Sequence, residues 1–120
     1  MAICNDGVAM KAGTNAGIIA NLLMGLMEER DAVEKFGRTW CRCSFKSMTV
    51  IYPFLSMAQV EYAIGQLRDK EIIISRKLSA GGFDHTNWYA FTEYGRKIMK
   101  WGDEHDVYPL SRTTLIFRGV

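Results

Sequence analysis

The stretch from residue 53 to residue 74 constrains the fold of this chain more than any other part of its sequence. Pro53 ends any helix before it, because proline lacks an amide hydrogen and clashes with the preceding turn. Ser56 then offers a side-chain oxygen to the free amides of a new helix, and Gln59 is placed to complete a capping box. Apolar residues follow at the spacing of one helical face: Val60, Ala63, Ile64 and Leu67. The sequence therefore predicts a turn, a helix packed along one side, and a strand beginning at residues 72–74.

The opposite side of this helix is predicted to face something outside the domain. It carries Met57, Ala58, Glu61, Tyr62, Gln66 and Arg68. Met57 and Tyr62 lie off the buried stripe by helical spacing, so we expect both to be exposed. Two acidic and two basic side chains cancel one another between residues 56 and 70: Glu61, Asp69, Arg68 and Lys70. The exposed face is therefore predicted to be electrically neutral.

Two helices are expected before this stretch. A short helix is predicted at residues 8–12 and is closed by Gly13, after which Thr14 offers an N-cap for a longer helix at about residues 15–30. The longer helix has so broad an apolar face that we interpret it as the central core helix. A dimerisation face is the alternative.

The segment between these helices and Pro53 contains one more strand and one more helix. The charged residues 28–38 predict a helix end and an exposed loop, and the alternating residues 39–43 predict a short half-buried strand. A short helix is expected at residues 45–51, capped by Ser44 or Ser47. Its inward side chains are predicted to be Phe45, Met48 and Ile51.

After the central helix the sequence predicts a hairpin, a last helix and a tail. Residues 72–78 and 85–91 are rich in strand-forming side chains and flank a Gly-Gly turn. A final helix is predicted at residues 92–101, and the apolar end of the tail is expected to pack on the domain or against another chain. The last helix is expected to return three residues to the core: Tyr94, Ile98 and Trp101. All three tryptophans, Trp40, Trp88 and Trp101, are expected in or near the core.

Composition favours one soluble domain. A chain of 120 residues suits one core, which we place in residues 1–102, with a tail at residues 103–120. We see neither a signal peptide nor an apolar run of about 20 residues, so the expected location is the cytoplasm and no membrane is expected among the partners. Three cysteines make a poor disulfide framework, and a net charge of +2 does not by itself identify a nucleic-acid-binding protein.

The predicted order of helix, helix, strand, helix, helix, hairpin and helix resembles a winged helix-turn-helix domain. Three local patterns are similar to the N-terminal domains of phage and plasmid replication initiators, also called replisome organisers, and to related phage regulators. These patterns are Phe54-Leu55-Ser56, the segment Leu67-Arg68-Asp69-Lys70-Glu71-Ile72-Ile73, and Asp84-His85-Thr86-Asn87-Trp88-Tyr89. Residues 91–96 are also similar to the junction after the wing in many bacterial winged-helix regulators. The resemblance implies a mainly helical α+β fold with a two- to three-stranded β-wing.

The resemblance implies a small DNA-binding protein of phage type, acting in regulation or replication. The helix at residues 56–70 would then enter the major groove of double-stranded DNA, and the hairpin would follow the backbone. Base contacts are assigned to Gln59, Tyr62 and Gln66, and the positioning of the duplex to Lys46, Ser56, Arg76, Lys77, His85 and Asn87. A stand-alone domain of this type is expected to form a homodimer.

A protein-docking function is the alternative. Relatives in the phage branch often carry basic residues in the first turns of this helix, where this chain has Met57, Ala58, Glu61 and Tyr62. A carboxylate at Glu61 would repel phosphates, whereas Met57 and Tyr62 suit a protein interface. The chain would then be a phage adaptor, or an anti-CRISPR-like inhibitor that binds a host protein.

No catalytic or cofactor-binding motif is identified. Neither the Asp84-His85 pair nor Cys43 is accompanied by a third group of a catalytic site, so we expect no enzyme activity and no cofactor. The cluster at residues 103–106 contains oxygen and imidazole groups that suit a metal ion. Four adjacent polar residues in a tail are more often solvated, and we assign no metal site.

Overall fold

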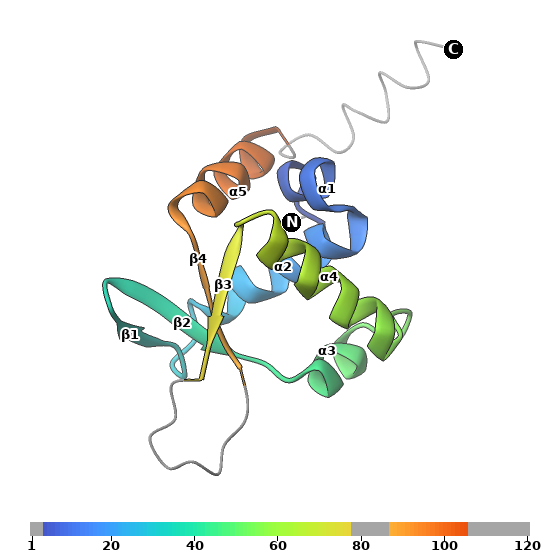
Figure 1. The fold of residues 1–120 in the computed structure, drawn as a ribbon, viewed down its shortest axis with the longest axis horizontal. Helices are drawn as coiled ribbons and strands as arrows, with labels where there is room; N and C mark the ends of the chain where they lie inside the picture. The colour runs from blue at the N-terminus through green and yellow to red at the C-terminus, as the bar shows by residue number, and fades with distance from the viewer. Residues whose placement is uncertain (1–3, 78–86, 106–120) are drawn as a thin grey trace.

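The computed structural model describes residues 4–77 and 87–105, which form a mainly helical α+β structure (Figure 1). The helices are α1 (Asp6–Ala12), α2 (Thr14–Leu26), α3 (Phe45–Ile51), α4 (Met57–Asp69) and α5 (Glu93–His105). The strands are β1 (Val33–Lys35), β2 (Arg38–Arg42), β3 (Ile73–Arg76) and β4 (Trp88–Phe91). The α+β class and the helical bias predicted from the sequence are therefore confirmed.

The four strands form one antiparallel sheet in the order β1-β2-β4-β3. The pairing of β3 with β4 confirms the predicted hairpin, whose Gly-Gly tip lies outside the described residues. Side chains of odd-numbered residues on β2, β3 and β4, including Cys41, Ile73 and Phe91, join the hydrophobic core with α2 and α4. Because side chains alternate along a strand, even-numbered residues point to the opposite face of the sheet.

The first hairpin corrects the expected loop at residues 28–38. β1 and β2 are joined by Phe36 and Gly37, whose φ angles of 54° and 72° are both positive, as a tight two-residue hairpin turn requires. The strand was missed because β1 has only three residues, Val33 alone among them apolar, so the sequence shows no alternation. The sheet therefore has four strands, rather than the two or three predicted.

The junction between α1 and α2 is tighter than predicted. Gly13, with a φ angle of 101°, ends α1 and is also the N-cap of α2, so Thr14 is the first helical residue and not the cap. α2 stops at Leu26 rather than near residue 30. The acidic residues after Leu26 oppose the negative end of a helix dipole, and the chain must also reverse there to form β1.

Asn5 joins three helices at this junction. Its side chain is 1% exposed, accepts a hydrogen bond from the Val8 amide at 3.1 Å, and donates one to the Met99 carbonyl at 3.0 Å. Its own amide donates to the Gly17 carbonyl at 3.2 Å. One buried residue thus caps α1 and connects it to α2 and α5.

The central stretch folds as its caps predict. Ser56 Oγ accepts a hydrogen bond from the Gln59 amide at 3.1 Å, and Gln59 Oε1 accepts one from the Ser56 amide at 2.8 Å, which completes the capping box. The predicted stripe is buried: Val60, Ala63, Ile64 and Leu67. Ser44 caps α3, whose range is also confirmed. Met48 is buried as expected, but Ile51 is 47% exposed, so its predicted inward position is wrong.

The predicted face of α5 is wrong at two of three positions. Ile98 is buried, whereas Tyr94 is 47% exposed and Trp101 is 41% exposed. The buried stripe of α5 contains Gly95 and Gly102, which have no side chains and let the helix lie close to neighbouring backbone. The large side chains are displaced to the flanks of this stripe.

The remaining tryptophan and tail predictions have different outcomes. Trp40 is 1% exposed and donates its indole hydrogen to the Lys35 carbonyl at 2.9 Å, and Trp88 is half-buried, so both lie in or near the packed part. α5 continues through His105, three residues beyond Gly102. The predicted packing of residues 115–117 lies outside the described residues.

Among the described helices, none is long and apolar enough to cross a membrane.

Cys41 on β2 and Cys43 just after its end belong to the hydrophobic core and are free thiols. Burial, with a smaller contribution from Cys43, raises the pKa of Cys41 to about 12. Because the folded pKa exceeds the ordinary value, the neutral thiol favours folding below about pH 9, and this contribution is lost as the pH rises toward 12. We expect Cys41 to resist iodoacetamide at pH 8 in the native protein and to react in urea, as read by peptide mass spectrometry. Equal rates in the two states would contradict its burial.

Candidate nucleic-acid interface

The outward face of α4 is exposed as predicted. Tyr62 is 70% exposed and Met57 is 45% exposed, and Glu61 is also at the surface. Gln66 is half-buried, which leaves it less accessible than the other two residues predicted to contact bases. This face is a mixed polar and apolar surface with a carboxylate at its centre.

Two of the predicted contact residues already serve the helix start. Ser56 and Gln59 hold each other in the capping box, so the Ser56 oxygen and the Gln59 carbonyl oxygen are occupied as acceptors. The Ser56 hydroxyl hydrogen and the Gln59 amide hydrogens remain donors in this arrangement. Both residues therefore suit a ligand that accepts hydrogen bonds, such as a phosphate or the acceptor edge of a base.

One end of the sheet brings together two arginines and a tryptophan. In the strand register, Arg42 lies opposite Trp88, and Trp88 lies opposite Arg76 on its other side. Paired residues of an antiparallel sheet point to the same face, so the three side chains form one row. We call Arg42, Trp88 and Arg76 the basic row.

The geometry of the basic row favours an anionic ligand. The Arg42 guanidinium carbon lies 5.4 Å from the centre of a Trp88 ring, within cation–π range. Arg76 and the following Lys77 are exposed. Within the described residues, the buried indole N–H of Trp88 has no hydrogen-bond partner. The row therefore presents two guanidinium groups, of which that of Arg42 lies over the indole ring, and its three residues include no carboxylate.

Arg42 was not among the predicted contact residues. The alternation of residues 39–43 places it on the side of β2 opposite Cys41 and Cys43, which was a signal for exposure. Its position beside Trp88 depends on pairing with a strand about 46 residues later, because Arg42 pairs with Trp88 only after β4 inserts between β2 and β3. No local pattern reports that pairing.

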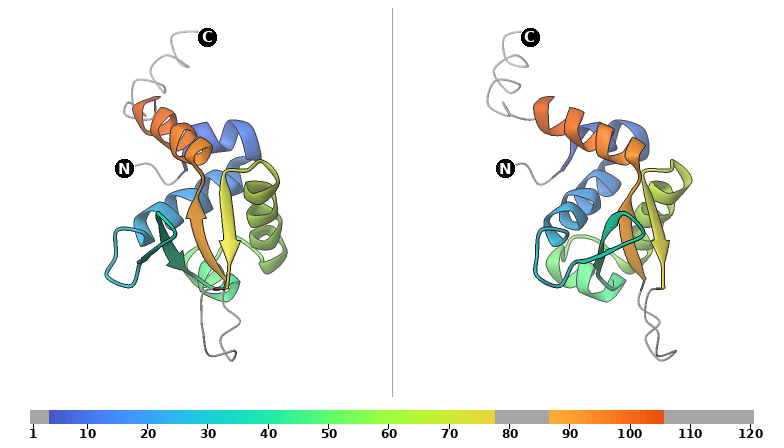
Figure 2. Two further views of the ribbon diagram at one scale, coloured as in Figure 1. Left: turned by 60° about the vertical axis from the view of Figure 1, so that its left-hand side comes forward. Right: turned by 90° about the vertical axis from the view of Figure 1, so that its left-hand side faces the viewer.

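The basic row and the start of α4 lie toward the same end of the molecule. In Figure 1, α3, the first turns of α4 and the end of the β3–β4 pair at which β3 ends and β4 begins lie at the bottom, whereas α1 and α5 lie at the top. Figure 2 shows the same separation in both further views. Lys46 on α3 is exposed at this lower end.

The other predicted contacts are less favourable. Asn87 is half-buried and its side chain hydrogen-bonds to Tyr89, which gives it a structural role at the start of β4. Arg68, in the last turn of α4, donates to Ser75 Oγ at 3.3 Å and so connects the helix to β3. His85 lies outside the described residues.

A second surface feature was only partly anticipated. Five large apolar side chains between the end of α3 and the second turn of α4 are strongly exposed. They are Val50 (73%), Ile51 (47%), Phe54 (60%), Met57 (45%) and Tyr62 (70%), and we call them the apolar cluster. The Phe54 ring packs beside Tyr52 at a centroid distance of 5.7 Å. So many exposed apolar side chains in one segment are typical of an interaction surface.

Metal-binding groups and the Cys43 thiol were considered in the described part of the chain. No group of three or more metal-binding side chains was found there. Cys43 is buried, and burial raises the pKa of its thiol, which disfavours the reactive thiolate. Searches of family models, curated proteins and solved structures found no match to this chain.

Proposed function

We propose that this protein is a winged-helix protein that binds double-stranded DNA. In this proposal α3, the turn at residues 52–56 and α4 form a helix-turn-helix, and β3 and β4 form the wing. α4 has 13 residues and is about 20 Å long, and an α-helix fits the major groove of B-DNA. Met57 and Tyr62, in its first two turns, would lie nearest the bases.

The observation that carries the proposal is the position of the basic row at the same end as the start of α4 (Figure 1). The exposed face of α4 is neutral, so it supplies little attraction to phosphates. Arg42 and Arg76 on the strands, Lys77 directly after β3 and Lys46 on α3 are exposed cations toward the same end of the molecule. In this arrangement the strands and α3 bind the backbone and α4 reads the groove.

The first test replaces two cations of the wing. We expect the double variant Arg76→Ala, Lys77→Ala to bind a pool of labelled duplexes more weakly. The loss of affinity should be similar for every DNA sequence in the pool. The slope of log affinity against log salt should also fall by about 1 for each phosphate that the variant no longer binds. Fluorescence anisotropy at several salt concentrations measures both quantities.

The matched control is Arg96→Ala with Lys97→Ala. These two cations are also exposed and adjacent, but they lie on α5 at the opposite end of the molecule. The control removes the same charge and is expected to change the salt slope little. Equal losses for the two double variants would mean that total charge, and not this surface, governs binding.

The apolar cluster supports a second candidate function, docking onto another protein. Aromatic and methionine side chains are the anchors that protein interfaces favour, and a neutral helix face avoids burying unpaired charge. For this function we expect Tyr62→Ala and Phe54→Ala each to lower the affinity for a purified partner by about 2 kcal/mol or more. Both side chains are more than half exposed, so unfolding free energies should change by about 0.5 kcal/mol or less. Unchanged partner affinity would exclude the cluster as the docking surface.

A further inference from the structure

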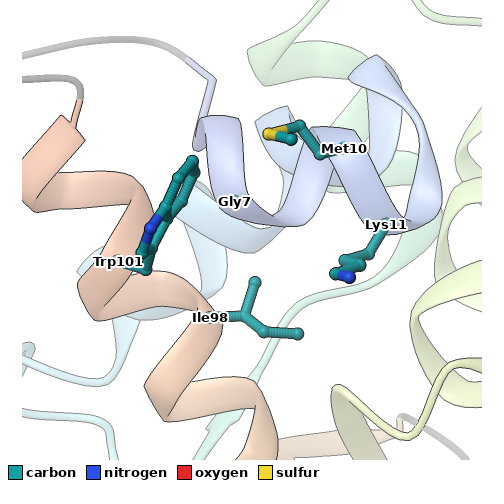
Figure 3. A pocket seen from close by; sticks show the side chains of 5 residues that line it. All are labelled: Gly7, Met10, Lys11, Ile98 and Trp101. Atoms are coloured by element: carbon teal, nitrogen blue, oxygen red, sulfur yellow. The ribbon is translucent and has the colours of Figure 1, made fainter.

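A separate apolar groove lies between α1 and α5, at the end of the molecule away from the basic row. It has a volume of about 270 Å³ and is lined by Gly7, Met10, Lys11, Ile98 and Trp101. Figure 3 shows Trp101 and Ile98 extending from α5 toward α1, which carries Gly7 and the Met10 and Lys11 side chains. The lining is apolar except for Lys11 at one rim.

The groove leaves large apolar side chains in contact with solvent. Met10 is 73% exposed and Trp101 is 41% exposed. Gly7 lets the two helices approach closely at the floor, because a Cβ there would collide with the Ile98 carbonyl. An apolar segment laid across Gly7 would remove both exposed side chains from water, at about 25 cal/mol for each Å² of apolar surface buried.

The same chain supplies a segment that suits this groove. Residues 106–120 follow α5 directly, and they include three consecutive large apolar residues, Leu115-Ile116-Phe117, after the polar run Ser111-Arg112-Thr113-Thr114. Trp101 is four residues before the end of α5, which corresponds to about 6 Å along the helix axis. Leu115 comes ten residues after His105, a reach of up to about 33 Å. The length therefore permits the chain to return to the groove.

We propose that Leu115-Ile116-Phe117 of the same chain occupies the α1–α5 groove. The covalent connection favours this occupant over a separate molecule, because a short linker gives an effective concentration in the millimolar range. A shallow apolar site that is too weak to retain a free partner at micromolar concentration is filled by a tethered segment. The bound segment would secure the end of α5 against α1.

Fluorine NMR of the 120-residue chain labelled with 5-fluorotryptophan tests this proposal. Its three tryptophans give separate reporters, and Trp101→Phe assigns the signal of interest. In the variant Leu115→Ser, Ile116→Ser, Phe117→Ser, we expect the Trp101 resonance to shift and its solvent isotope effect to increase. Trp40 and Trp88 should not change. The control Thr113→Ser with Thr114→Ser alters the same segment without removing apolar side chains and should leave all three signals in place.

A substitution in the groove tests the same contact from the other side. Met10→Gln is expected to shift the backbone amide signals of residues 115–117, whereas Val50→Gln, which replaces another side chain that is 73% exposed, should not. A Trp101 signal that is identical in wild type and triple variant would overturn the proposal. A change that depends on protein concentration and accompanies a dimeric mass would assign the groove to a second copy and would also overturn it.

Discussion

Gly95→Ala is expected to lower the free energy of unfolding by about 3 kcal/mol, the upper end of the usual cost of overpacking a core. A Cβ at this position would collide with the Ile72 carbonyl oxygen and would lie 3.1 Å from the Ile72 Cα. These are backbone atoms that cannot rotate away. The same carbonyl accepts the Thr92 amide at 3.0 Å, so moving it would disturb the junction of β4 with α5. Urea denaturation of the purified variant measures the loss.

Gly65→Ala is the matched control and should have the opposite sign. Gly65 is inside α4, and a Cβ there meets no atom within 4 Å. Alanine is favoured over glycine in a helix interior by about 0.5–1 kcal/mol, so this variant should be more stable than wild type. A Gly95→Ala protein as stable as Gly65→Ala would show that α5 does not approach Ile72 as described.

Asn5→Ala is expected to cost about 3 kcal/mol, because it combines two separate losses. The Val8 amide loses its cap at the start of α1, and the buried Met99 carbonyl loses its side-chain donor. Removing the Asn5 side chain would also leave a gap beside Gly102 of α5, which packs against it. Thermal and urea denaturation report the change.

Ser44→Ala is the comparison for Asn5→Ala, because Ser44 also caps a helix but is not buried. Ser44 accepts the Ser47 amide at 3.1 Å at the start of α3, but it lies at the surface. Its loss should cost about 1 kcal/mol. If both variants lost the same amount, the contact between Asn5 and α5 would contribute nothing.

The sequence predicted best those elements whose signals are local. The capping pair Ser56 and Gln59, the stripe that includes Val60 and Leu67, and the breaker Pro53 together identified α4 and its buried side, because caps and periodicity act within a few residues. The strands β3 and β4 were likewise visible as β-rich segments on either side of glycines.

The errors occurred where tertiary packing overrides local preference. For α5, the large residues Tyr94 and Trp101 suggested the core side, but both are exposed. The core side instead carries Gly95, which lies against the Ile72 backbone, and Gly102, which lies against the Asn5 side chain, and neither position has room for a Cβ. Helical spacing alone does not distinguish a face that buries bulk from one that permits close approach.

The candidate site was predictable in part. Exposure of Met57 and Tyr62 followed from helical periodicity, and it is confirmed. Arg42 entered the site only through the register of β2 with β4, which depends on a strand order that local patterns do not encode. The apolar cluster could likewise be recognised only from the structure, which shows that Val50 at the end of α3 and its apolar neighbours are exposed.

The most direct test of the proposed DNA surface is an amide NMR titration of the 120-residue chain with a duplex of mixed sequence. The titration is done at about 50 mM salt, where phosphate contacts are strong. The proposal predicts that signals of Arg42, Trp88 and Arg76 shift together with those of the first two turns of α4, while those of α1 and α5 stay in place. Signals that do not move at any duplex concentration, or that move only on α1 and α5, would contradict it.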